Sequence, residues 1–161
     1  MTKNTSTSGI AAGDIYPNRF VKLTSTDFTI AQAEAGERTV GISTVGSEKT
    51  PETYYQSDTL QPLATVGRTC SYFQEGTDCM LEVGASDITA GALLAPDANG
   101  KAVAVANNAP YGARALAAAT SGTLAKVRIE FGTGPIVETP QVQSDWTEAD
   151  TEDPAFILNK P

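Results

Sequence analysis

The chain has 161 residues and a net charge of −8, from 11 Lys and Arg against 19 Asp and Glu. A protein that binds the phosphate backbone needs a basic patch, so we expect no nucleic acid partner. No apolar stretch approaches the ~20 residues that cross a bilayer, and the polar start of the chain lacks the apolar core of a secretion signal. We therefore expect a chain that is made in the cytoplasm and has no membrane partner.

The sequence contains no histidine. This excludes Ser-His-Asp and Cys-His nucleophile systems and most catalytic zinc sites. The acids nearest to apolar runs are Glu82, Asp87 and Asp97, and each stands alone in a turn or at a strand end, where solvated carboxylates are usual. We therefore expect no enzymatic activity, no cofactor and no bound metal.

The N-terminus, residues 1–8, is almost entirely polar and is expected to form a flexible arm. An arm that becomes ordered on another surface is the alternative. Residues 9–134 contain short apolar runs separated by turn residues, a pattern that indicates an all-β domain. The expected strands are Ile15 to Leu23, Thr39 to Thr44, Leu60 to Tyr72, Cys79 to Val83, Ala92 to Ala95, Lys101 to Ala106 and Thr123 to Phe131.

Two local patterns support these strands. Between Lys126 and Phe131, apolar and charged residues alternate strictly, which indicates a strand with one buried face. The segment from Asp97 to Gly100 contains Asn-Gly between two apolar runs and is typical of a hairpin turn, since these residues accept positive φ. Residues 113–119 are compatible with either a helical turn or a strand.

A weak internal repeat also occurs in the domain. Ile10 to Gly13, followed by an apolar run, is similar to Ile88 to Gly91, and each copy leads to a later segment that contains glycine. Chance similarity of turn residues is the alternative. A true repeat would indicate two related β units packed as one small barrel or sandwich.

The two cysteines, Cys70 and Cys79, lie on either side of a predicted turn. A disulfide across the two strand ends is geometrically possible. Reduced, buried thiols are favoured for a cytoplasmic product.

Gly132, Gly134 and Pro135 end the last predicted strand, so the domain boundary is placed after residue 134. Residues 135–161 are expected to be extended. The predicted fold class is therefore mainly β: a small barrel or sandwich domain followed by an extended C-terminal tail. Six of the 19 acids lie in this tail. They lack the spacing of a calcium loop, which favours a solvated acidic segment.

The tail also carries large apolar side chains, at Trp146, Phe156, Ile157 and Leu158. Their burial is worth several kcal/mol, at roughly 25 cal/mol per Å², but the tail is too short to form its own core. They must therefore pack against another surface. That surface is either the parent domain or further copies of the same segment around a threefold axis.

This tail closely resembles the Gln-x-Asp-Trp-x-x-x-Asp…Pro-x-Phe-Ile-x-Asn-Lys-Pro motif of phage head-fibre proteins and of other trimeric phage fibre chains. The resemblance implies that the tail forms a homotrimer. The residues that it places at the trimer interface are Trp146, Asp150, Pro154, Phe156, Ile157, Asn159, Lys160 and Pro161.

Residues 9–131 more loosely resemble capsid decoration (cement) proteins. The two resemblances together imply a structural virion protein on the outer surface of a tailed-phage capsid, with the major capsid protein as its partner. Such a protein stabilises the shell or displays a short fibre. The alternative is a carbohydrate- or host-surface-binding module of a phage fibre, for which Tyr54, Tyr55 and Tyr72 are the possible exposed aromatic residues.

Overall fold

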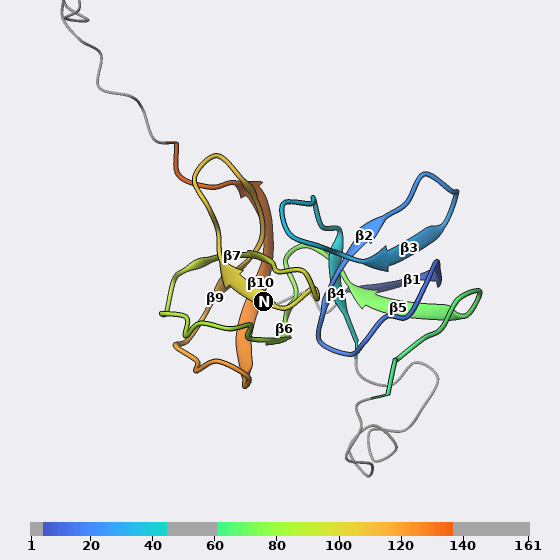
Figure 1. Cartoon of the computed structure of the whole chain (residues 1–161), viewed down its shortest axis with the longest axis horizontal. Helices are drawn as coiled ribbons and strands as arrows, with labels where there is room; N and C mark the ends of the chain where they lie inside the picture. The colour runs from blue at the N-terminus through green and yellow to red at the C-terminus, as the bar shows by residue number, and fades with distance from the viewer. Residues whose placement is uncertain (1–4, 45–60, 137–161) are drawn as a thin grey trace, which may run out of the picture.

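The computed structural model describes residues 5–44 and 61–136, and every regular element in them is a β-strand. The strands form two five-stranded sheets that lie side by side, β1 to β5 in one and β6 to β10 in the other (Figure 1). The fold class predicted from the sequence, mainly β, is confirmed. The described residues contain no helix that is long and apolar enough to cross a membrane.

The first half of the chain forms a closed barrel, with the strands in the order β1, β3, β2, β4, β5. Strand β5 pairs with β1 to close it, and all pairs are antiparallel except β1 with β3. The bounds are β1 Ser6–Ala11, β2 Phe20–Leu23, β3 Thr29–Gln32, β4 Gly41–Ser43 and β5 Thr69–Phe73.

The second half forms a sheet with the order β6, β10, β9, β7, β8. A single parallel bridge between Val83 and Ala102 connects the residue after β6 to the start of β8. The bounds are β6 Asp78–Glu82, β7 Leu93–Pro96, β8 Ala102–Ala104, β9 Pro110–Ala115 and β10 Leu124–Thr133.

The two halves share one topology. Strand β1 pairs with β5, β5 with β4, β4 with β2 and β2 with β3, and the second half repeats these pairings with β6, β10, β9, β7 and β8. The registers agree as well. Ile10 pairs with Thr69, and Glu82, which stands 72 positions after Ile10, pairs with Leu124. All five residue pairs between β1 and β5 have a counterpart between β6 and β10, so the domain is an internal duplication.

Residues with positive φ mark the same turns in both halves. Nine described residues have positive φ, and eight of them form four pairs at equivalent positions. The ninth, Gly76, lies between β5 and β6, where the halves join. The equivalent pairs are Asn18 with Gly91, Phe28 with Gly100, Gly36 with Asn108, and Gly67 with Gly122.

The repeat predicted from the sequence therefore exists, but the predicted alignment of its two copies is wrong. The sequence pattern aligns Ile10 with Ile88, whereas the structure aligns Ile15 with Ile88. Ile15 forms an isolated bridge with Ala64, and Ile88 forms the equivalent bridge with Ala119. The prediction aligned Gly13 with Gly91 because both are glycines. In the structure, the turn position equivalent to Gly91 is occupied by Asn18, which also has positive φ.

Each of the seven predicted strands overlaps an observed strand, but some of the predicted ranges were too long. The predicted strand from Leu60 to Tyr72 yields β5, which begins only at Thr69, and the one from Ile15 to Leu23 yields the short β2. Strand β3 was not predicted at all. The ambiguous residues 113–119 contain the end of β9 and then irregular backbone.

The predicted N-terminal arm, residues 1–8, includes residues that belong to the first strand. Residues Ser6, Thr7 and Ser8 belong to β1 and pair with Phe73, Tyr72 and Ser71 of β5. Backbone pairing needs no apolar side chain, so a run of Ser and Thr completes the barrel. Residues 1–4 lie outside the described part of the chain.

At the other end, the domain extends slightly past the predicted boundary. The amide of Asn108 donates a hydrogen bond to the carbonyl of Pro135 at 3.0 Å, and that of Gly134 donates to Ala109 at 2.7 Å.

The two local sequence patterns are confirmed. Val127 and Ile129 are buried while Lys126 and Arg128 are exposed, and β10 then shifts register by a bulge before Gly132. Strands β7 and β8 form the expected hairpin around Asp97 to Gly100. Of its Asn-Gly pair, only Gly100 has positive φ.

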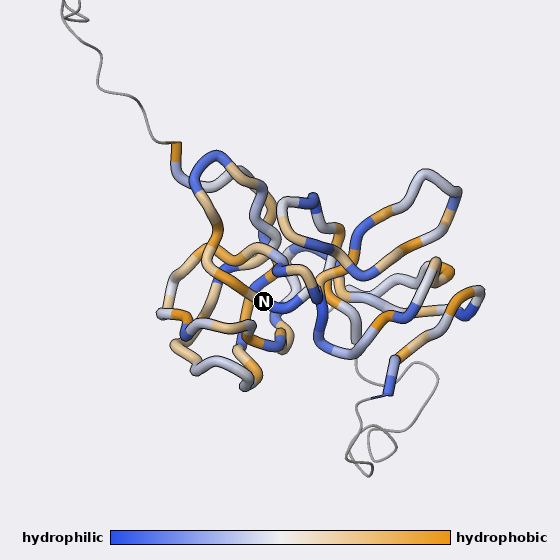
Figure 2. Tube along the Cα trace, viewed as in Figure 1, coloured by the Kyte–Doolittle hydropathy of each residue, from blue (hydrophilic) through white to orange (hydrophobic). Residues whose placement is uncertain are grey.

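A shared core joins the two halves. Phe20 of the barrel is fully buried in the same apolar cluster as Leu81, Val127 and Ile129 of the second sheet. The backbone of Gly112 approaches so closely that an added Cβ would stand 2.8 Å from the Phe20 ring. Figure 2 shows apolar segments on the strands of both halves. A second cluster, built around Ile15, Val21 and Ile30, fills the barrel itself.

The duplication predicts opposite effects of two substitutions in equivalent turns. Phe28 has a φ of 57° and is 84% exposed, while Gly100 occupies the same turn position with a φ of 71°. Phe28→Gly should raise the free energy of unfolding by about 0.5–1 kcal/mol, because a left-handed conformation penalises any side chain. Gly100→Ala should lower it by about 2 kcal/mol, since its Cβ would lie 2.8 Å from Gln32 Cγ. Urea denaturation measures both.

Phe28→Ala is the matched control, because it removes the ring but keeps the backbone penalty. If Phe28→Gly and Phe28→Ala destabilise the domain equally, the Phe28 ring must make stabilising contacts with the domain. That result would contradict the prediction.

Candidate functional site

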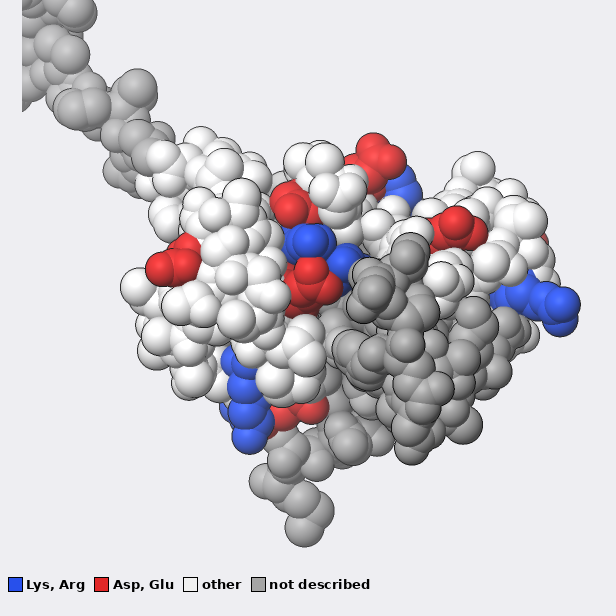
Figure 3. Space-filling view, turned by 60° about the horizontal axis from the view of Figure 1, so that its bottom comes forward, with Lys and Arg blue, Asp and Glu red and all other residues white. Residues whose placement is uncertain are grey.

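A network of ion pairs lies where the two halves meet. Arg19, just before β2, pairs with Glu82 at the end of β6, and Lys101 Nζ lies 2.8 Å from the other Glu82 oxygen. The Arg19 side chain is only 4% exposed. Figure 3 shows basic and acidic atoms together in the middle of one face.

The backbone fixes this network in place. The Arg19 amide donates to Ser43 Oγ at 3.0 Å, and the Ser43 hydroxyl donates to the Tyr16 carbonyl at 2.6 Å. Across the junction, the Phe20 amide donates to the Gly100 carbonyl at 2.8 Å. These bonds hold Arg19 and the hairpin that carries Lys101 against each other.

The environment of Glu82 favours its ionised form. Burial alone raises the pKa of Glu82, but hydrogen bonds from Lys101 and Arg19 outweigh burial and lower it below its usual value near 4.5. The carboxylate therefore stays charged and binds both cations. With two cations and one carboxylate, the network carries a net positive charge.

A polar pocket of about 360 Å³ opens beside this network. Both halves of the chain contribute to it, with no large aliphatic side chain in the lining. The lining residues are Tyr16, Arg19, Gln32, Asn99 and Lys101. We call it the junction pocket.

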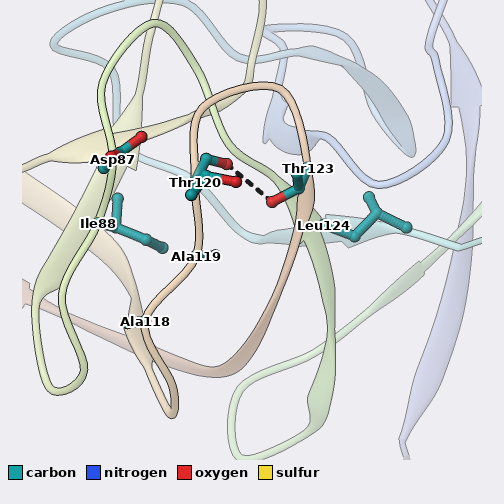
Figure 4. A pocket seen from close by; sticks show the side chains of 7 residues that line it. All are labelled: Asp87, Ile88, Ala118, Ala119, Thr120, Thr123 and Leu124. Atoms are coloured by element: carbon teal, nitrogen blue, oxygen red, sulfur yellow. Dashed lines mark hydrogen bonds between the residues drawn. The ribbon is translucent and has the colours of Figure 1, made fainter.

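A second pocket, of about 450 Å³, lies within the second half, next to the turn before β10. Figure 4 shows that mostly small side chains line it, and that Thr123 donates a hydrogen bond to the carbonyl of Thr120. Its carboxylate, Asp87, already accepts a bond from the amide of Ser121 at 2.8 Å. The Asp87 carboxylate and the Thr120 carbonyl therefore already have partners within the domain.

The structure gives each of the three acids considered from the sequence a structural contact. Glu82 belongs to the ion-pair network, and Asp87 holds the turn at Ser121. Asp97 Oδ1 accepts bonds from the amides of Asn99 and Lys101, at 2.7 and 2.9 Å. Within residues 5–44 and 61–136, no three His, Cys, Asp or Glu side chains come together as a metal site.

The cysteines are free and buried, as the favoured interpretation expected. Cys70 belongs to the barrel cluster and Cys79 to the shared cluster, so they face different cores. Burial, aided by the nearby Asp78 charge, raises the pKa of the Cys79 thiol to about 12.

The predicted aromatic platform does not form at Tyr72. That side chain is only 9% exposed and packs inside the barrel cluster, so it is not a surface for ligands. Tyr54 and Tyr55 lie outside the described residues, as does the whole predicted trimer interface from Trp146 to Pro161. The junction pocket was missed because its residues are scattered along the chain and converge only when the two halves pack.

Comparison with solved structures finds a similar fold. The fold is similar to that of the head fiber gp8.5 N base in bacteriophage phi29, with a TM-score of 0.53, 16% sequence identity, and coverage of 80% of this chain and 95% of that chain. At this identity the likeness shows a shared fold. No protein-family model matches the chain, and no curated protein matches it.

The ion-pair network leads to a prediction with a defined pH dependence. Glu82→Gln should lower the free energy of unfolding at pH 7 by about 3 kcal/mol, because it leaves the buried Arg19 without a counter-charge. The pKa of Glu82 is lowered in the folded state, so its stabilisation is complete above pH ~4.5 and is lost as the pH falls through the lowered pKa. Denaturation of wild type and variant at pH 7 and pH 3 measures this difference.

Asp78→Asn provides the control, because it breaks an ion pair with Arg128, whose side chain is 48% exposed. It should cost about 0.5 kcal/mol. Equal losses in the two variants, or a Glu82→Gln loss that is undiminished between pH 7 and pH 3, would contradict the role given to the buried network.

Proposed function

We propose that the chain is a structural protein of a tailed-phage head, whose duplicated β domain attaches to the outside of the capsid and whose C-terminal tail forms a trimeric fibre. Two independent features support this. The fold of the domain is similar to the base of a phage head fiber, and the tail resembles a fibre motif in a part of the sequence that the described fold does not include. The fold likeness is the observation that carries the proposal.

The order of the two parts fits this function. In the structural relative, the matched chain is a base, and here the matching domain likewise precedes the fibre-like tail. A base that attaches a fibre to a shell must bind and hold, and it needs no catalytic group. Glu82, Asp87 and Asp97 serve as structural contacts, which is consistent with that role.

Trimer formation by the tail gives the first test. A chain that ends after Ile136 keeps the hydrogen bond to the Pro135 carbonyl, so the domain should remain folded but become monomeric. The full-length chain should have three times the monomer mass by multi-angle light scattering. A truncated chain that stays trimeric would show that the domain, and not the tail, holds the trimer together.

Trp146→Ala should weaken the trimer by about 3 kcal/mol, as expected for an aromatic ring that is lost from a buried interface. Thr147→Ala is the matched control, because Thr147 stands next to Trp146 at a position that the motif leaves open. Sedimentation equilibrium over a range of concentrations measures the association of both variants. If the two variants associate equally, Trp146 does not contribute to the trimer interface.

Attachment to the shell is tested by co-sedimentation with capsids assembled from the major capsid protein of the same genome. The full-length chain should pellet with capsids, and the bound amount should reach a plateau. The chain that ends after Ile136 should also bind, but more weakly, because it is no longer multivalent. The absence of binding by the full-length trimer would overturn the capsid assignment and leave the trimeric fibre assignment intact.

A further inference from the structure

The junction pocket has an excess of hydrogen-bond donors. Arg19 uses only Nη1 on Glu82, and its Nε and Nη2 have no partner among the residues that the structure describes. In that part of the chain, Thr39 Oγ1 is the one polar side-chain atom that is both sealed from solvent and unpartnered. The free Arg19 nitrogens are therefore not fully sealed from solvent, although the side chain is only 4% exposed, and Arg19 lines the pocket.

The amide side chains add to this excess. Gln32 Oε1 accepts a hydrogen bond from the amide of Tyr16 at 3.2 Å, which leaves its NH₂ group free to donate. The stem of Gln32 packs against Gly100, where a Cβ would lie 2.8 Å from Gln32 Cγ. Asn99 comes from the adjoining turn and brings a second amide to the lining.

These residues are not inherited from the duplication. The positions equivalent to Tyr16 and Arg19 in the second half are Thr89 and Ala92, and the position equivalent to Lys101 in the first half is Thr29. The polar set therefore exists once, where the halves meet. The strand pairings of a single half do not require Tyr16 and Arg19, because the second half forms the same pairings with Thr89 and Ala92 in their places.

The lining favours an acidic sugar. The planar guanidinium of Arg19 and the ammonium of Lys101 suit a carboxylate. The amides of Gln32 and Asn99 both donate and accept, as sugar hydroxyls do, and Tyr16 offers an apolar ring face with a polar tip. The volume of about 360 Å³ lies within the ~300–1,000 Å³ range of small-molecule sites.

We propose that the junction pocket binds the carboxylate-bearing sugar of an acidic glycan. An Asp or Glu side chain of a protein partner would use Arg19 and Lys101 but would leave the ring and both amides without a role. This ligand is additional to capsid attachment and does not depend on it.

The test is an NMR titration of the ¹⁵N-labelled full-length chain with sodium glucuronate, with glucose, acetate and inorganic phosphate as separate ligands. Glucuronate should give saturable shifts of the Gln32 and Asn99 side-chain amides and of the Lys101 backbone amide. Glucose, which lacks the carboxylate, and acetate, which lacks the ring, should each bind at least about tenfold more weakly.

Two variants and one control locate the site. Lys101→Gln should weaken glucuronate binding about tenfold, and Asn99→Ala should weaken glucuronate without changing the response to acetate. Lys22→Gln is the matched control, because Lys22 is also a partly exposed lysine paired with a glutamate, Glu37, away from the pocket. It should leave binding unchanged, and the dispersion of the amide spectrum checks that each variant is folded.

Several results would overturn the proposal. If glucuronate causes no saturable shift, the junction pocket does not bind it. Acetate that binds as tightly as glucuronate would show a carboxylate site without sugar recognition, which fits a protein partner. Phosphate that displaces glucuronate at equal concentration would assign the site to phosphate groups. Equal effects of Lys22→Gln and Lys101→Gln would reduce the binding to nonspecific charge.

Discussion

The whole described domain depends on a charged side chain that is buried between its two halves. Arg19 is almost completely enclosed, and Glu82 from the other half supplies its counter-charge. Around this pair, Phe20 enters the core of the second sheet and the Gly100 hairpin is bonded to the barrel. Since a buried charge without its partner is costly, the halves are held in one relative position, and the pocket beside the pair exists only in that position.

The duplication explains why such different sequences form the same fold twice. Barrel and sheet share pairings, registers and left-handed turn positions, yet few identical residues remain between them. What both copies need is backbone geometry, namely a residue with positive φ in each turn, which is Gly or Asn everywhere except at Phe28, and apolar residues inside. The longest difference is the connection from Ser43 to Ala64, which corresponds to the short connection from Ala115 to Ala119.

Sequence reasoning found the strands that alternate clearly and the turns that contain glycine. Val127 and Ile129 reveal β10 by their period of two, and Asp97 to Gly100 reveal the β7–β8 hairpin, because these are local signals. It missed β3, and assigned part of β1 to a flexible arm, because polar residues such as Ser6 pair only through their backbone. The junction pocket could not be predicted, since Gln32 and Asn99 become neighbours only through the packing of two halves. Of the expected tail interface, no residue falls in the described part of the chain.

The closed barrel also determines how copies of this domain can associate. Strand β5 returns to β1, so the first half presents no free strand edge. In the second half, the outer strands are the short β8 and β6, and β6 carries the ion-paired Asp78. Strand β8 has only three residues and β6 presents a charge, so both edges are poor templates for adding a strand from another chain. Any association of the described domain with another chain would therefore be specified by surface side chains and not by backbone pairing.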